Sequence, residues 1–212
     1  VAKITRIHHQ DGIFAEFIHR PEVSNLLGHL LGDDVDCFSS SFIFKSPGAL
    51  GQPWHQDAWY HRMEPSNQIS AWLAVTETTI DNGALWLLPG SHREPVHAVE
   101  PDPRPGARPG YVAIADHDME AGIPLLLDPG DMVLFGSNLM HRSTDNLTDT
   151  PRAAMLYHFG SAGTYDPTLD PDPAAFASHL SDIRAEAPLA AGATEERVRN
   201  LWIPIRRAAQ SV

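Results

Sequence analysis

The chain of 212 residues (23.3 kDa) is long enough for one domain with a sizeable core and short for two. Its formal net charge of -12 and pI near 5.3 argue against sequence-independent nucleic-acid binding and against docking on an anionic membrane, because both need a basic surface. We therefore expect a small-molecule partner. The single cysteine, Cys37, permits no internal disulfide and no cysteine-based zinc site, so any metal must use nitrogen and oxygen ligands.

Targeting signals are not evident in the sequence. The first residues lack the apolar run of a signal peptide, and no stretch approaches the roughly 20 apolar residues of a membrane span. We therefore expect a cytoplasmic protein that is not bound to a membrane. The sequence leaves the oligomeric state open.

The first predicted elements are two short helices within residues 11–32, where apolar residues recur at helical spacing and Pro21 interrupts the pattern. From about 38 to 163 the sequence changes to short runs rich in aromatic and β-branched residues. Turn signals at 81–83, 89–90 and 128–131 separate these runs, and no long helix alternates with them. The runs are FSSSFIFKS, ISAWLAVTET, ALWLLPGS, DMVLFGSNLMHRS and RAAMLYHFGS. This pattern predicts a mainly β fold, an antiparallel sandwich or jelly roll with flanking helices.

Two segments fall outside this pattern. Residues 94–122 are rich in proline and glycine and only weakly periodic, and we expect them to form a lid or a substrate loop. The tail, 164–212, is predicted to hold a loop and a short helix within 166–187, followed by an apolar run at 201–205. We take residues 1–212 as one domain.

A tripeptide, His55-Gln56-Asp57, carries the first chemical signal. In an extended strand, residues i and i+2 point to the same side, so His55 and Asp57 would present an imidazole and a carboxylate together while Gln56 faces away. His141 ends a later β run, and an antiparallel fold can bring it opposite. Two histidines and one carboxylate leave three coordination positions open, which suits Fe(II) that binds a bidentate cosubstrate and O2.

The same tripeptide occurs twice, which supplies an internal control. With 12 histidines in the chain, about one His-x-Asp is expected by chance. In the other copy, at 9–11, Asp11 precedes a helical pattern and is predicted to cap that helix rather than to bind metal. The copy at 55–57 instead follows a β run and a Gly/Pro turn and is flanked by Trp54, Trp59 and Tyr60.

Arg152 lies eleven residues after His141 and opens the run RAAMLYHF, which can return antiparallel alongside the strand ending in MHRS. There its planar guanidinium could grip the distal carboxylate of a dicarboxylic cosubstrate through two parallel hydrogen bonds. A lone arginine is otherwise a solvated surface residue.

These residues resemble the phytanoyl-CoA dioxygenase family of Fe(II)/2-oxoglutarate oxygenases. The matching text is FIFKSPG, PWHQDAWY, SAWLAVTETTIDNGALWLLPGSH, GDMVLFGSNLMHRSTDN and PRAAMLYHF, from about 42 to 160. The resemblance implies a double-stranded β-helix with iron at one mouth. It implies these roles: iron ligands His55, Asp57 and His141; 2-oxoglutarate clamp Arg152 with the helper Ser143; cosubstrate-site residues Trp72 and Lys45. Relative to the family, less chain precedes the first helix, so we expect a shortened or compact member.

Each secondary assignment has a structural alternative. Trp72 can simply belong to the core, and Lys45 can end an exposed strand. His92 is expected in a turn, and His158 as a packed strand histidine near the cosubstrate. The residues that follow the metal tripeptide are expected to meet substrate, namely Trp59, Tyr60, His61 and Arg62.

By this resemblance the chain is expected to be an Fe(II)- and 2-oxoglutarate-dependent dioxygenase that uses O2 to hydroxylate an unactivated C-H of a small organic metabolite and releases succinate and CO2. Related halogenases have a small residue in place of the carboxylate ligand, so Asp57 favours hydroxylation or desaturation. The aromatic residues Trp59, Tyr60 and Trp86 suggest an uncharged or mildly polar substrate.

Two other classes of protein stay open. A cupin-like zinc or manganese hydrolase or isomerase could use the same three ligands without a dicarboxylate clamp, so it would not need Arg152. A catalytically inactive, ligand-binding jelly roll would form no succinate with any substrate.

Overall fold

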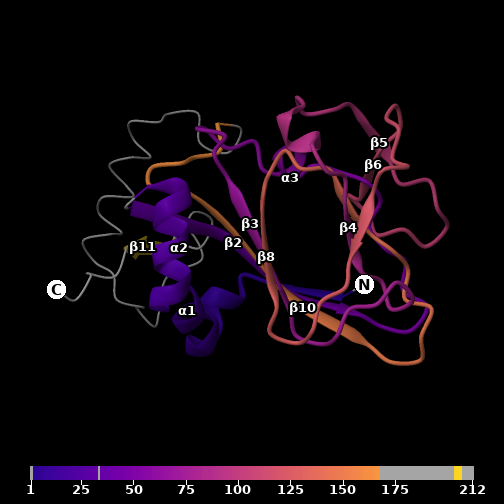
Figure 1. The fold of residues 1–212 in the computed structure, drawn as a ribbon, viewed down its shortest axis with the longest axis horizontal. Coiled ribbons are helices and arrows are strands. Elements are labelled where there is room, and N and C mark those ends of the chain that lie inside the picture. The colour runs from indigo at the N-terminus through magenta and orange to yellow at the C-terminus, as the bar shows by residue number, and fades with distance from the viewer. Residues whose placement is uncertain (1, 33, 168–202, 207–212) are drawn as a thin grey trace. The chain divides into compact units, whose positions relative to one another are not determined.

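A computed structural model describes residues 2–32, 34–167 and 203–206 of the chain. None of the helices in these ranges is long and apolar enough to cross a membrane. The described part is mainly β, with three α-helices and two short 3-10 helices (Figure 1). In chain order the elements are β1 (Ala2–Thr5), η1 (Ile7–His9), α1 (Gly12–His19), α2 (Pro21–Leu31), β2 (Asp34–Lys45), α3 (Asp57–Tyr60), β3 (Ile69–Ala74), β4 (Leu85–Leu87), η2 (Ser91–Arg93), β5 (Val99–Pro101), β6 (Val112–Ile114), β7 (Ile123–Leu125), β8 (Met132–Gly136), β9 (His141–Ser143), β10 (Arg152–Ser161) and β11 (Ile203–Arg206).

The chain forms two compact units. The first consists of Val1–Thr5, Ser41–His61 and Ser70–Leu156, and the second of Arg6–Ser40, Arg62–Ile69 and Tyr157–Val212. The long strands β2 and β10 supply residues to both units.

The second unit holds α1 and α2, the two helices expected within 11–32. The side chain of Asp11 accepts a hydrogen bond from the backbone N-H of Ile13 at 3.0 Å, so Asp11 caps α1 as predicted. Arg20 is extended (ψ 137°) because it precedes Pro21, and this ends α1. Pro21 then opens α2, where its missing N-H costs no helical bond.

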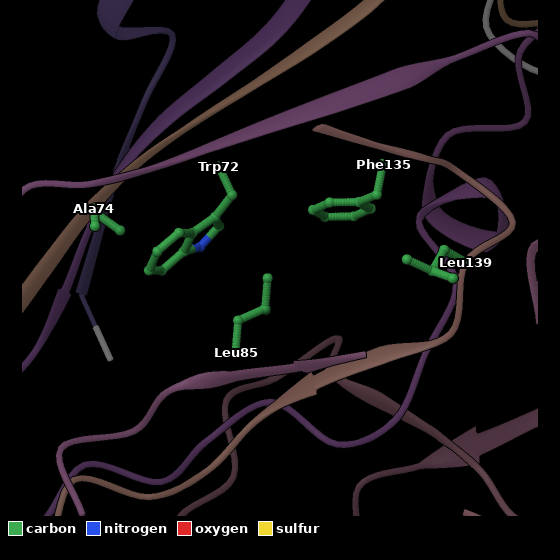
Figure 2. Packing of buried hydrophobic residues seen from close by; sticks show 6 residues of the cluster. Trp72, Ala74, Leu85, Phe135 and Leu139 are labelled. Carbon is green, nitrogen blue, oxygen red and sulfur yellow. The ribbon is translucent and has the colours of Figure 1, made fainter. Parts of the chain in front are cut away.

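Two sheets of the jelly roll supply the core of the first unit. One has the order β1-β2-β10-β3-β8, with β11 also pairing β2, and the other has the order β7-β4-β9. Figure 2 shows Trp72 and Phe135 reaching from one layer of strands toward Leu85 on the other, with Leu139 at the same interior. Each of these four side chains is at most 9% exposed, so the space between the layers is filled by packed apolar groups.

The predicted β runs are confirmed as strands, with one difference in pairing and one in continuity. β10 lies between β2 and β3, not beside the strand that carries His141, which pairs with β4 instead. The run at 131–143 is divided into β8 and β9, because the chain turns at 137–140 and so passes from one sheet to the other.

The segment 94–122, expected to be an irregular lid or substrate loop, contains the antiparallel hairpin β5–β6. Of the expected tail elements, the loop and helix within 166–187 lie almost entirely outside the described residues. The apolar run at 201–205 overlaps β11, which pairs antiparallel with β2.

Candidate metal centre

His55 and His141 face each other across a short antiparallel bridge in the first unit. The backbone N-H of each residue donates to the carbonyl oxygen of the other at 3.0 Å. Their rings lie side by side, with centroids 4.1 Å apart. Because His141 opens β9 and β9 pairs with β4, the position of both rings is set by the smaller sheet.

The expected strand at His55-Gln56-Asp57 is reduced to this bridge, because Asp57 begins the one-turn helix α3. Gln56 is nevertheless extended (φ -117°, ψ 134°), so His55 and Asp57 do point to the same side. Gln56 points away, as predicted, and its amide nitrogen donates to the carbonyl oxygens of Pro95 and Asn138 at 3.0 and 2.9 Å.

Asp57 Oδ1 faces the Nε2 atoms of both imidazoles, 3.7 Å from His55 and 3.6 Å from His141. Donor atoms that each lie about 2.1 Å from one metal are roughly 3.0 to 3.4 Å apart, so a small inward shift would bring all three into coordination distance. The three residues are 4–5% exposed. They therefore form a buried cluster of two histidines and one carboxylate able to hold a metal ion.

The second nitrogen of each imidazole fixes which atom is free to bind metal. Nδ1 of His55 lies 2.7 Å from the carbonyl oxygen of Pro53, and Nδ1 of His141 lies 2.9 Å from that of Leu139. A carbonyl oxygen only accepts, so Nδ1 carries the hydrogen and Nε2 keeps its lone pair in the neutral ring. Burial, and then His141, lower the pKa of His55 to about 3, which keeps its lone pair available.

Asp57 is oriented by Ser70, a residue of β3. The Ser70 hydroxyl donates to Asp57 Oδ2 at 2.6 Å, which leaves Oδ1 directed at the imidazoles. This arrangement suits a carboxylate that binds a metal through one oxygen.

Lys45, Ser143 and Arg152 gather around Gly83 in the same unit. Lys45 Nζ donates to Ser143 Oγ at 2.9 Å and to the carbonyl oxygen of Thr144. Arg152 Nη2 donates to the carbonyl oxygen of Gly83 at 2.6 Å. Gly83 has a φ of 93°, and a Cβ there would lie 2.9 Å from Lys45 Nζ. Only glycine therefore allows the Lys45 side chain to approach this turn so closely.

Both basic side chains are buried, and within the described residues neither forms an ion pair with a carboxylate. Arg152 is 2% exposed and Lys45 1%, and Arg152 Nε has no hydrogen-bond partner among the described residues. Burial, and then Arg152, lower the pKa of Lys45 to about 6, while burial lowers that of Arg152 to about 10. An anion at this position would offset the cost of burying both charges.

Trp72 belongs to the core and also contacts Arg152. It is 3% exposed and packs in the core cluster with Phe135 and Leu85. The guanidinium of Arg152 also lies over its ring, 5.3 Å from the centroid. Trp72 thus acts as a core residue whose face supports the arginine.

The expected substrate residues lie on α3 and directly after it. Trp59 and Tyr60 lie on α3, half-buried, with the Tyr60 ring 5.6 Å from that of His55, and His61 follows them. Arg62 is exposed and belongs to the second unit. Trp86 lies under the guanidinium of Arg142, 4.9 Å from the ring centroid.

Two further histidines, His92 and His158, are not part of the triad. His92 is exposed in η2, next to the predicted turn. His158 belongs to the second unit, where it stacks on Phe38 with centroids 5.9 Å apart, so its predicted packing role is confirmed.

Three features escaped the sequence analysis. Ser70 could have been noticed because it precedes Trp72 by two residues, so both project from the same face of β3. Gly83 was identified as a turn residue but not as the meeting point of two cations. Glu94, His97 and His117 form a second cluster able to hold a metal, and only the spacing Glu-x-x-His hinted at it.

Comparison with known proteins gives a consistent result. Residues 1–154 match the phytanoyl-CoA dioxygenase (PhyH) family. Dioxygenase lolE1 of Epichloe uncinata is 36% identical over 136 residues, which cover 63% of this chain and 50% of that protein. Phytanoyl-CoA dioxygenase 1 of Oryza sativa subsp. japonica is 31% identical over 158 residues, covering 72% and 54%. The chain thus spans about half the length of these curated relatives.

A solved structure agrees with these matches. EvdO2 from Micromonospora carbonacea var. aurantiaca, complexed with 2-oxoglutarate, superposes with a TM-score of 0.64 at 26% identity, covering 78% of this chain and 69% of that one. The shared fold is the double-stranded β-helix. Because the family match extends over more than half of the chain, the chain belongs to the phytanoyl-CoA dioxygenase family, whose members use Fe(II), 2-oxoglutarate and O2.

Proposed function

We propose that this chain is an Fe(II)- and 2-oxoglutarate-dependent dioxygenase that hydroxylates a C-H bond of a small organic molecule. The observation that carries the proposal is the buried triad of His55, Asp57 and His141, in which two imidazole lone pairs and one carboxylate oxygen converge. This is the ligand set that non-haem Fe(II) oxygenases use, and it leaves positions for a cosubstrate and O2.

The three ligands would reach the metal already oriented. The backbone carbonyls of Pro53 and Leu139 hold the imidazoles with Nε2 forward, and Ser70 leaves Asp57 Oδ1 available. No ligand needs to release a proton from its donor nitrogen, because both rings already carry their hydrogen on Nδ1.

Arg152 would bind the distal carboxylate of 2-oxoglutarate, with Lys45 and Ser143 beside it. Support comes from the buried guanidinium of Arg152, whose Nε has no hydrogen-bond partner among the described residues, and from the hydrogen bond of Lys45 to Ser143. A guanidinium can hold a carboxylate through two parallel bonds, and the Trp72 ring keeps its plane fixed.

When bound, Fe(II) with 2-oxoglutarate and O2 supplies the oxidation, in which one oxygen atom enters the succinate and the other enters the substrate as a hydroxyl, with CO2 released. The chain itself supplies position and the exclusion of water, since the three ligands are 4–5% exposed. Because the carboxylate of Asp57 fills the third ligand position, hydroxylation or desaturation is favoured over halogenation.

The finer expectations belong to the same proposal. We take residues 1–212 as one oxygenase domain, because β2 and β10 run through both units. The half-buried Trp59 and Tyr60 favour an uncharged or mildly polar substrate. The net charge of -12 argues against nucleic-acid and membrane partners, and one buried cysteine fits the cytoplasm.

Anaerobic addition of Fe(II) and 2-oxoglutarate tests the proposal. The expected result is a visible charge-transfer band of the chelate, followed by substrate-triggered succinate release when a panel of metabolites is screened with O2. The exposed His92, replaced in His92→Gln, serves as the control and should leave the band unchanged. If iron-loaded wild-type protein forms no band, the proposal is wrong.

A further inference from the structure

A second cluster of potential metal ligands lies at the open end of the β5–β6 hairpin. In the register of this hairpin Val99 pairs with Ile114, so continuing both chains outward by two residues brings His97 opposite Asp116, next to His117. Glu94 follows η2 and approaches from the same side. The cluster therefore joins residues up to 23 positions apart in the sequence, Glu94 and His117.

The donor atoms of the cluster converge on one point. Nε2 of His97 and Nε2 of His117 each lie 3.0 Å from the same oxygen, Oε2 of Glu94. The two rings are nearly perpendicular, at 83°, with centroids 5.3 Å apart. The side chain of Asp116 stands farther out, with Oδ1 3.9 Å from Nδ1 of His97.

The hydrogen bond of His117 to a backbone carbonyl indicates which of its ring nitrogens can bind a metal. Nδ1 of His117 lies 2.8 Å from the carbonyl oxygen of Asp118, which can only accept, so Nδ1 carries the hydrogen. In the neutral ring, Nε2 then directs a lone pair at a carboxylate oxygen 3.0 Å away, and two acceptors repel each other at that distance. Either a proton or a metal ion between them removes the repulsion. His55 and His141 show the same arrangement, with Nδ1 on a backbone carbonyl and Nε2 facing a carboxylate.

The backbone around the cluster is held in place by residues of the first unit. Gln56, which is 1% exposed, accepts a hydrogen bond from the backbone N-H of His97 at 2.8 Å and donates to Pro95. The amide of Asn138 donates to the carbonyl oxygen of Glu94 at 3.2 Å. Two of the three ligands are thus positioned before any metal binds, which lowers the cost of assembling the site.

We propose that Glu94, His97 and His117 form a second metal site, which takes a divalent transition-metal ion such as Zn²⁺ and closes the open end of the β5–β6 hairpin. Two imidazoles and a carboxylate are a ligand set that Zn²⁺ prefers, with water in the remaining position. The side chains of Glu94, His97 and His117 are 36%, 18% and 23% exposed, so an ion can enter from solvent. Gln56 links this site to the triad through the chain between His55 and Asp57.

Counting bound zinc tests the proposal independently of oxygenase activity. Protein stripped with a chelator is titrated with Zn²⁺, and bound metal is measured after gel filtration. We expect two equivalents for the wild type and one for His117→Gln, with binding to the second site weakened at least tenfold. His97→Gln is the second variant, and circular dichroism checks that each variant is folded. His92→Gln, from the same segment but outside the cluster, should keep both equivalents.

The background variant His141→Ala separates this proposal from the proposed function. It should retain one equivalent, and adding His117→Gln should remove it. If the triad binds no metal, wild type retains one equivalent and His117→Gln none, and the second site still stands. Equal stoichiometry and affinity in wild type, His97→Gln and His117→Gln would overturn the second site and leave Glu94 in a hydrogen-bonded Glu–His cluster.

Discussion

The triad and the cluster at Glu94, His97 and His117 use the same residue types in two different settings. The triad is 4–5% exposed and held by the backbone bridge between His55 and His141. The second cluster is partly exposed, and a short hairpin brings its members together. The difference shows that the types of the ligand residues alone do not determine what a metal site does. The triad is buried and shares its unit with the basic residues Arg152 and Lys45, which suits catalysis. The second cluster is partly exposed and lies at the open end of a hairpin, which suits a metal ion with a structural role.

The largest expected effect is the difference in hydroxylation activity between variants of Asp57 and of Glu94, the carboxylates of the two clusters. Replacing Asp57 with Ala removes a ligand and should lower hydroxylation by roughly a thousandfold or more, because the metal loses both affinity and orientation. Glu94→Gln, the matched change in the other cluster, should lower it by less than about tenfold. Succinate release measured with the same substrate compares them. An Asp57→Ala enzyme with full activity would exclude Asp57 as a ligand.

The next effect concerns the buried Arg152 and Lys45, which belong to the same unit as the triad and are linked to the strand of His141 by the bond from Lys45 to Ser143. Arg152→Ala should weaken 2-oxoglutarate about a hundredfold, because a buried charge-assisted contact is lost and Lys45 is left alone. The KM for 2-oxoglutarate measures this, and Arg93→Ala, an exposed arginine in η2, is the control. An unchanged KM would mean that Arg152 does not bind the carboxylate of 2-oxoglutarate.

If Lys45 contacts the cosubstrate as proposed, we expect the affinity for 2-oxoglutarate to depend on pH. Burial, and then Arg152, lower the pKa of Lys45 from 10.5 to about 6. Between pH 6 and 10.5 the unfolded chain therefore holds a proton on Lys45 that the folded protein lacks. Because the unfolded state binds more protons, the free energy of unfolding rises with pH in this range. A carboxylate beside Lys45 raises its pKa again, so 2-oxoglutarate binding takes up a proton above pH 6. Affinity should therefore fall as pH rises, by at most about tenfold per unit.

Calorimetry in two buffers of different ionisation enthalpy measures this proton uptake. Wild type should take up close to one proton at pH 7.5, and Lys45→Met should take up none. Equal uptake by both proteins would mean that Lys45 does not contact the cosubstrate.

Sequence could predict the strands and the capping by Asp11 from local patterns, and the approach of His55, Asp57 and His141 from the resemblance to the family. It was wrong about where β10 lies, because strand order depends on which sheet buries which face and short runs do not encode that. The roles of Arg152, Lys45 and Ser143 stay predictions, supported by their arrangement around Gly83.

The second cluster illustrates a different limit. Its histidines meet only because of the register of β5–β6, and three-residue strands carry too little periodicity to reveal pairing. The partner of Gln56 could not be predicted from the sequence either. Alternation predicts that it faces away from the metal, but not that it holds the backbone of His97.

The smallest expected effect concerns the hydrogen bond that orients the carboxylate of Asp57 in the triad. The Ser70 hydroxyl donates to Asp57 Oδ2 at 2.6 Å, so Ser70→Ala leaves that oxygen free to rotate toward the metal or away. Fe(II) affinity should fall by about tenfold or less, because the ligands themselves stay in place. Equilibrium dialysis with Fe(II) under anaerobic conditions measures it. Ser70→Thr keeps the hydroxyl and should restore most of the affinity, and the exposed Ser46→Ala should change nothing. If Ser70→Ala binds Fe(II) as tightly as wild type, then the bridge between His55 and His141, and not the hydroxyl, is what fixes the triad.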